Sequence, residues 1–242
     1  AISAADSGAE VILIEKNEKL GKKVYITGKG RCNITNESDV ENLLKNVRSN
    51  PKFLYSAFYT FDSYRMMEFL EGEGLKLKTE RGNRVFPESD KSSDVIKTLK
   101  KALEKRKVKI ILNTKVLNID IKDGICHGVI VQSGDKSGSY TADKVIVATG
   151  GCSYQSTGST GDGYRFAKDA DIKVTKCYPS LVPFNIGSDI PKRLQGLSLR
   201  NVKVTLSDKG KVLYEELGEM LFTHFGVSGP LIISASSYVG KK

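Results

Sequence analysis

Residues 1–15 place the tightest constraint on the fold. Ala1–Ala5 is typical of a helix interior, Gly8 suits the residue that ends a helix, and Glu10–Ile14 is a short apolar run followed by Glu15. A helix, a glycine turn, a buried strand and an acidic residue at its end form the second half of a βαβ dinucleotide-binding unit. In such units the acidic residue binds ribose hydroxyls. The first strand and its G-x-G-x-x-G turn would come just before Ala1, so we expect a sequence truncated at this end, and also at its C-terminus.

Later segments continue this pattern. Val108–Leu112 and Lys144–Ala148 are apolar runs typical of buried strands, and Ser92 or Ser93 can cap a helix that leads into the first of them. Three alternating segments separated by turn residues predict an antiparallel meander: Val116–Ile121, Ile125–Gln132 and Ser139–Thr141. The sequence therefore predicts an α/β fold that combines a parallel sheet with a three-stranded antiparallel meander.

Two further regions complete the predicted organisation. Phe53–Leu70 carries apolar residues at helical spacing and predicts one or two helices that face the core. After about residue 180 the helical periodicity fades and short strand-like segments follow one another. We therefore predict two domains, an α/β domain over residues 1–188 and the beginning of a β-rich domain over residues 189–242.

The charge balance is basic. The chain has 38 basic and 28 acidic residues, a net charge of +10, and a local basic cluster in 97–109. Such a cluster is typical of a nucleic-acid-binding surface or, more often, of the solvated face of a helix. We favour the helix face and expect a small-molecule substrate and no nucleic-acid partner. A basic protein also suits anionic cofactors.

Cysteine, histidine and apolar runs narrow the protein class. Four cysteines without a C-x-x-C pair favour free thiols in a reducing cytoplasm. The two histidines, His127 and His224, are too far apart in sequence for a zinc site of ordinary spacing, so we expect no metal. No run approaches the ~18 consecutive apolar residues of a membrane-spanning helix.

Three glycine-rich segments carry the predicted chemistry. Residues 21–36 combine glycines, basic side chains and uncharged hydrogen-bonding groups, which suits a loop that binds phosphate. Residues 145–151 are a predicted strand ending in Ala-Thr-Gly-Gly, and residues 156–163 precede a predicted helix. Each alone is as consistent with a structural loop; together they favour a dinucleotide site.

The sequence resembles the YhiN/BaiN-type flavoproteins, a family named as NAD(P)/FAD-dependent oxidoreductases or aminoacetone-oxidase-like FAD-binding enzymes. The resemblance is most specific in the run Arg-Cys-Asn-Ile-Thr-Asn at 31–36 and covers nearly the whole chain. Lys29 departs from the family pattern, which has glycine there, and Gln155 stands where proline is usual. Other matching stretches are Gly82–Val95, Ala148–Tyr154, Gly158–Tyr164, Pro179–Pro183 and Gly218–Pro230.

The resemblance implies a Rossmann-like FAD-binding domain followed by the start of an inserted β-barrel domain. It implies that Glu15 binds the adenosine ribose, that Val116 contacts adenine through its backbone, and that the loops line the pyrophosphate and flavin. The other residues that it assigns to the cofactor are Lys16, Lys22, Thr27, Gly28, Gly30, Arg31, Cys32, Asn33, Thr35, Asn36, Ala148, Thr149, Gly150, Gly151, Gly161, Asp162 and Gly163.

The function implied is an FAD-dependent oxidoreductase that transfers hydride through the flavin, with NAD(P)H as a possible reductant. The alternative is a basic flavoprotein that binds nucleic acid without catalysis. No catalytic acid or base follows from the sequence; Cys32 beside Arg31 and His224 are weak candidates, each with a structural alternative. The sequence does not choose the substrate or the oligomeric state.

Overall fold

The computed structural model describes residues 1–239, which form two compact units. Unit 1 comprises residues 1–46 and 51–174, and unit 2 comprises residues 47–50 and 175–242, of which residues 240–242 lie outside the described part. The predicted second domain over residues 189–242 therefore also ends outside it. Among the described residues, no helix has both the length and the apolar character needed to cross a membrane.

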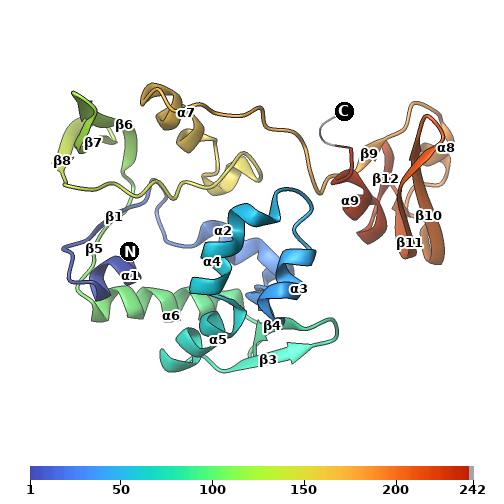
Figure 1. Cartoon of the computed structure of the whole chain (residues 1–242), viewed down its shortest axis with the longest axis horizontal. Coiled ribbons are helices and arrows are strands. Elements are labelled where there is room, and N and C mark those ends of the chain that lie inside the picture. The colour runs from blue at the N-terminus through green and yellow to red at the C-terminus, as the bar shows by residue number, and fades with distance from the viewer. Residues whose placement is uncertain (240–242) are drawn as a thin grey trace. The chain divides into compact units, whose positions relative to one another are not determined.

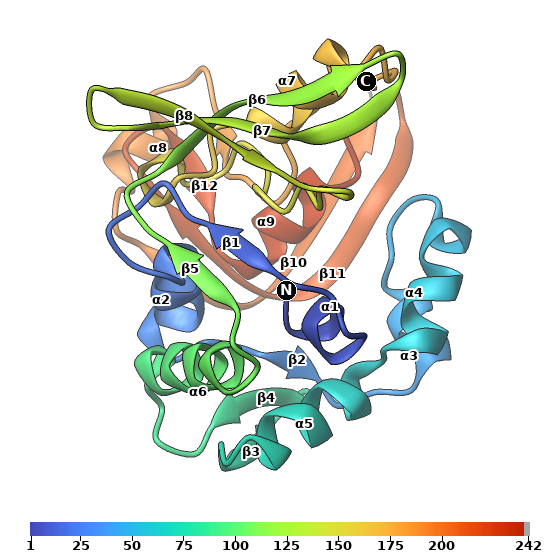
Figure 2. The same cartoon turned by 90° about the vertical axis from the view of Figure 1, so that its left-hand side faces the viewer.

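Unit 1 is built around a short parallel pair of strands (Figures 1 and 2). Helix α1 (Ile2–Asp6) ends before Gly8, and β1 (Ile12–Ile14) follows. Helix α6 (Ser92–Lys105) leads into β5 (Lys109–Ile111), which pairs in parallel with β1. This confirms the predicted helix–turn–strand beginning and the parallel sheet.

The helical part of unit 1 includes a small antiparallel sheet. That sheet has the order β2 (Thr35–Asn36), β4 (Arg84–Pro87), β3 (Leu77–Glu80). The remaining elements are α2 (Lys22–Ile26), the 3₁₀ helices η1 (Thr27–Gly30) and η2 (Pro51–Leu54), α3 (Val40–Lys45), α4 (Tyr55–Thr60) and α5 (Ser63–Gly72).

The core of unit 1 lies between α5, α6 and residues 27–36, which we call the Arg-Cys-Asn loop. Leu70, Leu75 and Val95 are buried together with Cys32, and Met66, Phe69 and Leu99 pack against them. The predicted helices in 53–70 are confirmed, but of the three helices in this range only α5 faces the core as predicted. Phe53 is 79% exposed, and neither η2 nor α4 contains a buried residue.

The three-stranded meander is confirmed. Strands β6 (Lys115–Lys122), β7 (Ile125–Ser133) and β8 (Lys136–Thr141) pair in sequence order, with Asp123 and Gly124 both left-handed in the first turn. Two consecutive left-handed residues are the conformation of the tight hairpin turn expected for Asp-Gly. Leu117 is left out of the β6–β7 register, which marks a bulge at the start of β6.

The predicted strand at 144–148 is wrong. These residues lie outside every described strand, and Ile146 is 75% exposed. A short apolar run becomes a strand only where another strand satisfies its backbone groups, and no described strand pairs with this one. The segment leads instead through 149–154 to the 3₁₀ helix η3 (Gln155–Thr157) and to α7 (Asp162–Asp169).

Unit 2 is a four-stranded antiparallel sheet of order β10-β11-β12-β9. The strands are β9 (Phe184–Asn185), β10 (Ser198–Asp208), β11 (Lys211–Phe222) and β12 (Gly226–Ser228). Helix α8 (Ile190–Arg193) precedes β10, and α9 (Pro230–Ser236) packs on β11, burying Leu231, Ile232 and Ala235. The successive strands of this unit agree with the β-rich structure predicted after about residue 180.

Candidate functional site

The carboxyl end of β1 carries the predicted ribose-binding residue, Glu15. Its backbone amide continues the parallel ladder by donating to the carbonyl of Ile111 at 2.8 Å, and its carbonyl accepts from Thr114 at 3.1 Å. Its Oε1 accepts from the backbone amide and the side-chain Nδ2 of Asn17, both at 2.8 Å. The carboxylate is therefore held in one orientation at the edge of the sheet where open α/β folds bind ligands.

Lys16 joins this edge to the third glycine-rich segment. Its Nζ donates to Thr160 Oγ1 at 2.7 Å and to Asp162 Oδ2 at 2.8 Å. The ammonium lowers the pKa of Asp162, with Thr160 and Lys115 adding to the same effect. Asp162 is the first residue of α7, where a carboxylate is also favoured by the helix dipole.

The two glycine-rich loops pack against one another and against the end of β1. The amide of Gly161 donates to the carbonyl of Gly151 at 3.1 Å. A Cβ on Gly163 would lie 2.8 Å from Thr149 Oγ1, and one on Gly158 would lie 2.8 Å from Asn17 Nδ2. The absence of a side chain at Gly158 and Gly163 permits this approach, and the structure brings Ala148–Gly151 and Gly161–Gly163 together.

The Arg-Cys-Asn loop has an unusual backbone. Gly28, Lys29, Gly30 and Cys32 all have positive φ, at 55°, 58°, 86° and 61°. The amide of Cys32 closes the loop by donating to the carbonyl of Thr27 at 3.0 Å. Lys29 thus adopts a left-handed conformation at the position where the family pattern has glycine, which explains that preference.

Arg31 is engaged within the protein. Its Nε donates to Asp90 Oδ1 at 2.7 Å, its Nη2 pairs with Glu80, and its guanidinium lies 4.1 Å from the centre of the Phe86 ring. Lys78 also contacts Asp90, at 2.6 Å. Arg31 lowers the pKa of Glu80, and Lys78 together with Arg31 lowers the pKa of Asp90. The guanidinium fastens the loop to β3 and β4, so its expected contact with phosphate has no support in this arrangement.

The other polar residues of the loop divide between two places. Thr35 and Asn36 lie on β2, and Asn36 Nδ2 donates to the carbonyl of Gly82 at 2.7 Å. Lys22 begins α2, and its Nζ reaches toward the end of β1, 3.3 Å from Asn17 Oδ1. Lys22 therefore joins Glu15 and Lys16, whereas Thr35 and Asn36 anchor the loop to its sheet.

Val116 lies at the start of β6, two residues after the amide of Thr114 that contacts Glu15. The adenine and ribose positions implied by the family resemblance are thus neighbours in the fold. Arg165 on α7 donates to the carbonyl of Leu117 at 2.6 Å and to Asn118 Oδ1 at 2.8 Å. Sequence reasoning missed Arg165, because nothing in a one-letter sequence signals a contact with a bulge 48 residues away.

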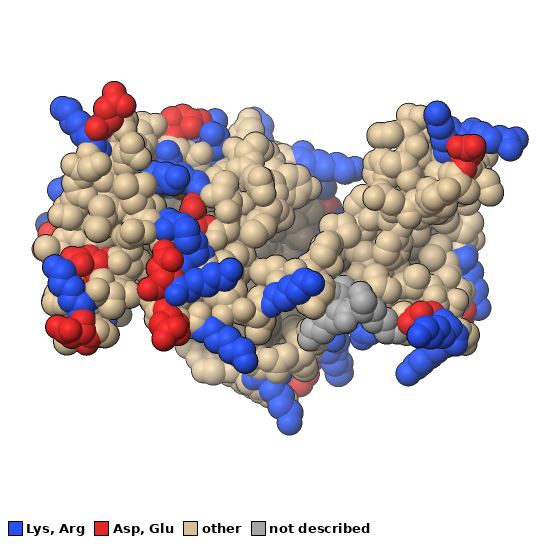
Figure 3. All heavy atoms as spheres, turned by 90° about the horizontal axis from the view of Figure 1, so that it is seen from above, with Lys and Arg blue, Asp and Glu red and all other residues tan. Residues whose placement is uncertain are grey.

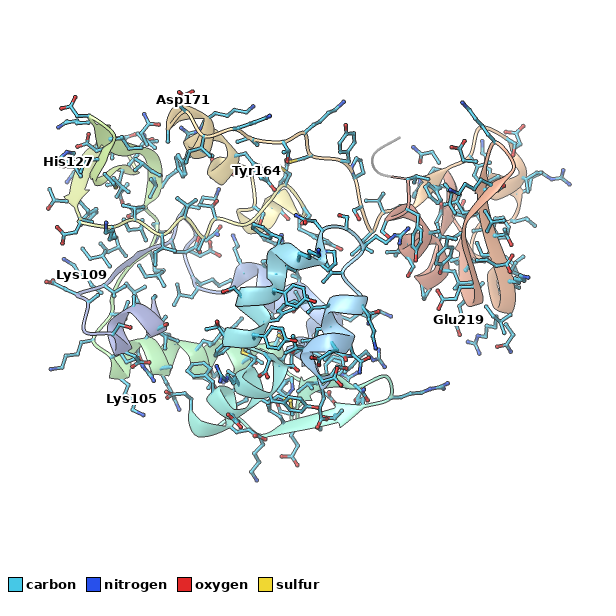
Figure 4. All side chains as sticks on the ribbon, viewed as in Figure 1. Lys105, Lys109, His127, Tyr164, Asp171 and Glu219 are labelled. Atoms are coloured by element: carbon cyan, nitrogen blue, oxygen red, sulfur yellow. The ribbon has the colours of Figure 1, made fainter. Side chains whose placement is uncertain are left out.

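The two weak catalytic candidates have contrasting surroundings. Cys32 is 6% exposed in the core, and burial raises the pKa of its thiol, which opposes the activated thiolate considered from the sequence. His224 is exposed in a turn of unit 2, edge-on to Phe225, with the turn closed by a bond from the amide of Thr223 to the carbonyl of Gly226. His127 lies on β7 in unit 1 (Figure 4).

An apolar pocket of about 630 Å³ adjoins the Arg-Cys-Asn loop. Thr27, Cys32 and Asn33 line it from the loop, and Phe61, Met66, Phe69 and Leu99 are among the apolar residues that complete it. The sequence pattern assigned those apolar residues to a closed core and so did not predict a pocket. Within residues 1–239 no three His, Cys, Asp or Glu side chains are placed to hold a metal ion.

The basic cluster at 97–109 lies mostly on the outer face of α6. Figure 4 shows Lys105 projecting away from the helix. Several of its lysines have acidic neighbours: Lys97 lies 3.7 Å from Asp94, and Lys100 lies 3.6 Å from Glu104. On the face drawn in Figure 3 basic and acidic side chains are likewise interspersed. The arrangement agrees with a solvated helix face.

Comparisons with known proteins agree with this fold. Residues 1–234 match the model of the HI0933-like protein Rossmann domain. The chain is 31% identical over its whole length to a 3-dehydro-bile acid delta(4,6)-reductase of Clostridium scindens, of which it covers 57%. It is 30% identical over 97% of its length to a ribosomal RNA dihydrouridine synthase of Escherichia coli, of which it covers 56%.

The chain thus spans little more than half the length of these curated relatives. A solved structure of Mycobacterium smegmatis Sdh1 in complex with UQ1 resembles it with a TM-score of 0.53 at 18% identity, over 70% of this chain and 35% of the other. That likeness supports the fold. From the match over residues 1–234 and the dinucleotide-binding architecture at β1, we conclude that this chain belongs to the HI0933-like protein family.

Proposed function

We propose that the protein is an FAD-dependent oxidoreductase. The observation that carries the proposal is the convergence of Glu15, the Lys16–Asp162 pair and two glycine-packed loops at the carboxyl end of β1. A held carboxylate suits a ribose, and backbone without side chains suits the close approach of a flat or anionic group. These features fit an adenine dinucleotide.

The proposed contacts follow from this placement. Glu15 would bind the adenosine ribose, Val116 would contact adenine, and Lys16 and Lys22 would lie near the negative charge of the pyrophosphate. The loop backbones would hold the pyrophosphate and the isoalloxazine, through Thr27, Gly28, Gly30, Cys32, Asn33 and the segments 148–151 and 161–163. Arg31, Thr35 and Asn36 would support the first of these loops.

The bound flavin would supply hydride transfer, and the chain would bind and orient its substrate. The names of both curated relatives describe adding hydrogen to carbon–carbon double bonds, in a bile acid and in uridine of RNA. We propose the same reaction class here: reduction of a double bond conjugated with a carbonyl, by one hydride and one proton. NAD(P)H would restore the reduced cofactor.

Free thiols at all four cysteines suit a cytoplasmic protein.

The substrate has two candidate classes. A small unsaturated ketone is favoured by the bile-acid relative, and an RNA base by the ribosomal RNA relative together with the net charge of +10. The sequence comparison alone does not separate them, since the identities are 31% and 30%. The salt dependence of the binding affinity separates the two classes. Binding to RNA weakens steeply as the salt concentration rises, whereas binding of a neutral ketone does not.

The test is anaerobic reduction of the full-length holoprotein. NADH or NADPH should bleach the flavin absorption, and one of two oxidants, a steroid with a conjugated enone or protein-free ribosomal RNA, should restore it with a product heavier by two hydrogens. A flavin that neither nucleotide reduces would contradict the role of NAD(P)H. Reduced flavin that transfers hydrogen to neither substrate would contradict the proposed reaction class.

A further inference from the structure

Helix α7 is attached at two points to the two strands that carry the proposed adenosine contacts. At its first residue, Asp162 pairs with Lys16, directly after Glu15 at the end of β1. One turn further, Arg165 reaches β6 at Leu117 and Asn118. Figures 1 and 2 both show α7 lying beside β6. The helix therefore bridges the ribose side and the adenine side of the proposed site.

The second attachment contacts β6 at its bulge. Leu117 is the bulged residue between the paired positions Val116 and Asn118, so the β7 ladder does not fix it. Strand β6 is also an edge strand, with no neighbour on its other side in the described part of the chain. The guanidinium donates to the carbonyl of the bulge at 2.6 Å and to the next side chain at 2.8 Å.

Arg165 is itself held in place. Its guanidinium lies 4.6 Å from the centre of the Phe166 ring, and Phe166 is only 4% exposed. Asp169, one turn along the helix, lies 3.2 Å from Arg165 Nη1. Two bonds in a fork are a geometry that arginine provides and that lysine, as a point charge, reproduces only in part.

We infer that Arg165 is a positioning residue for the adenine end of the cofactor site, acting by fixing the β6 bulge beside Val116. Through this contact Arg165 sets where the Val116 backbone lies relative to Glu15. It has no effect on how the flavin end of the cofactor is bound. The inference rests on the proposed function, because it assumes that an adenine dinucleotide binds at β1 and β6.

The prediction is a selective loss of affinity. Replacing Arg165 by Gln removes charge-assisted hydrogen bonds to the bulge, and we expect FAD and ADP to bind about tenfold more weakly. FMN lacks the adenosine half, so its affinity should change less than twofold. Arg165→Lys should recover part of the loss. Lys168→Gln, which removes an exposed charge from the same helix, should bind all three ligands as the wild type does.

The experiment titrates the full-length apoprotein of each variant with FAD, ADP and FMN, and measures amide hydrogen exchange across residues 115–120. Faster exchange there in Arg165→Gln, with the selective loss of FAD and ADP, would support the inference. Unchanged FAD affinity, or equal weakening of FMN, would overturn it. Failure of the wild type to bind FAD at all would overturn the proposed function and this inference with it.

Discussion

The Arg-Cys-Asn loop allows a prediction whose size follows from two glycines two residues apart. Both have positive φ, Gly28 at 55° and Gly30 at 86°. A Cβ on Gly28 would lie 2.8 Å from the backbone nitrogen of Asn33 and 3.4 Å from a Phe86 ring carbon, whereas a Cβ on Gly30 would meet nothing within 4 Å. Gly30→Ala is therefore a matched control that shares the conformation but lacks the collision.

The expected costs separate accordingly. A left-handed alanine costs about 1–2 kcal/mol, of which the stiffer unfolded chain returns roughly 0.4–1 kcal/mol. Gly30→Ala should thus lower the free energy of unfolding by about 0.5–1 kcal/mol. Gly28→Ala adds a collision with backbone, which cannot rotate away, worth roughly 1–3 kcal/mol. Its total should be about 1.5–4 kcal/mol.

The measurement is equilibrium urea unfolding of both variants and the wild type, followed by circular dichroism. Gly28→Ala should unfold at clearly lower urea than Gly30→Ala with a similar m-value. Equal midpoints for the two variants would refute the loop geometry on which the proposed cofactor contacts depend.

Three further predictions concern the ends of the site. Glu15→Gln should weaken FAD about tenfold or more by loss of a charge-assisted hydrogen bond to ribose, measured by flavin fluorescence titration; Glu10→Gln, just before β1, should not, and equal effects would contradict the ribose assignment. Because the pKa of Asp162 is lowered in the folded protein, its stabilising effect is present above the ordinary carboxyl pKa and is lost as pH falls through the folded value. Unfolding curves of Asp162→Asn should therefore converge on the wild type as pH is lowered through that range, and a gap that stays constant with pH would argue against it. The buried Cys32 should react with a thiol reagent far more slowly than the exposed Cys152 in timed mass spectrometry of the native protein, and equal rates would contradict the core placement.

Local pattern predicted much of the fold. The helix, glycine turn, strand and Glu15 at the beginning, the β6–β8 meander and the helix after the third glycine-rich segment all follow from periodicity and turn residues. The strand expected at 144–148 failed because an apolar run records only a tendency to be buried. Whether it joins a sheet depends on a neighbouring strand, which no residue within the run specifies.

The candidate site, like the fold, could be predicted from the sequence only in part. The family resemblance assigned residues 148–151 and 161–163 to the cofactor, and in the structure these two segments pack against one another. The side-chain partner of Arg31 was not predictable, because Glu80 and Asp90 come from distant segments and compete with phosphate for the same guanidinium. The clamp of Arg165 on Leu117 was missed for a related reason: it depends on a bulge that appears only once β6 and β7 are paired.

The most direct test of the central claim, that β1 and the glycine-rich loops form an FAD site, is a competition titration on the full-length protein. The purified protein should show the visible absorption bands of flavin. After the cofactor is removed, FAD should restore those bands stoichiometrically, and ADP should compete with it. A colourless protein that FAD does not restore would contradict the claim, as would FAD binding that ADP leaves unchanged.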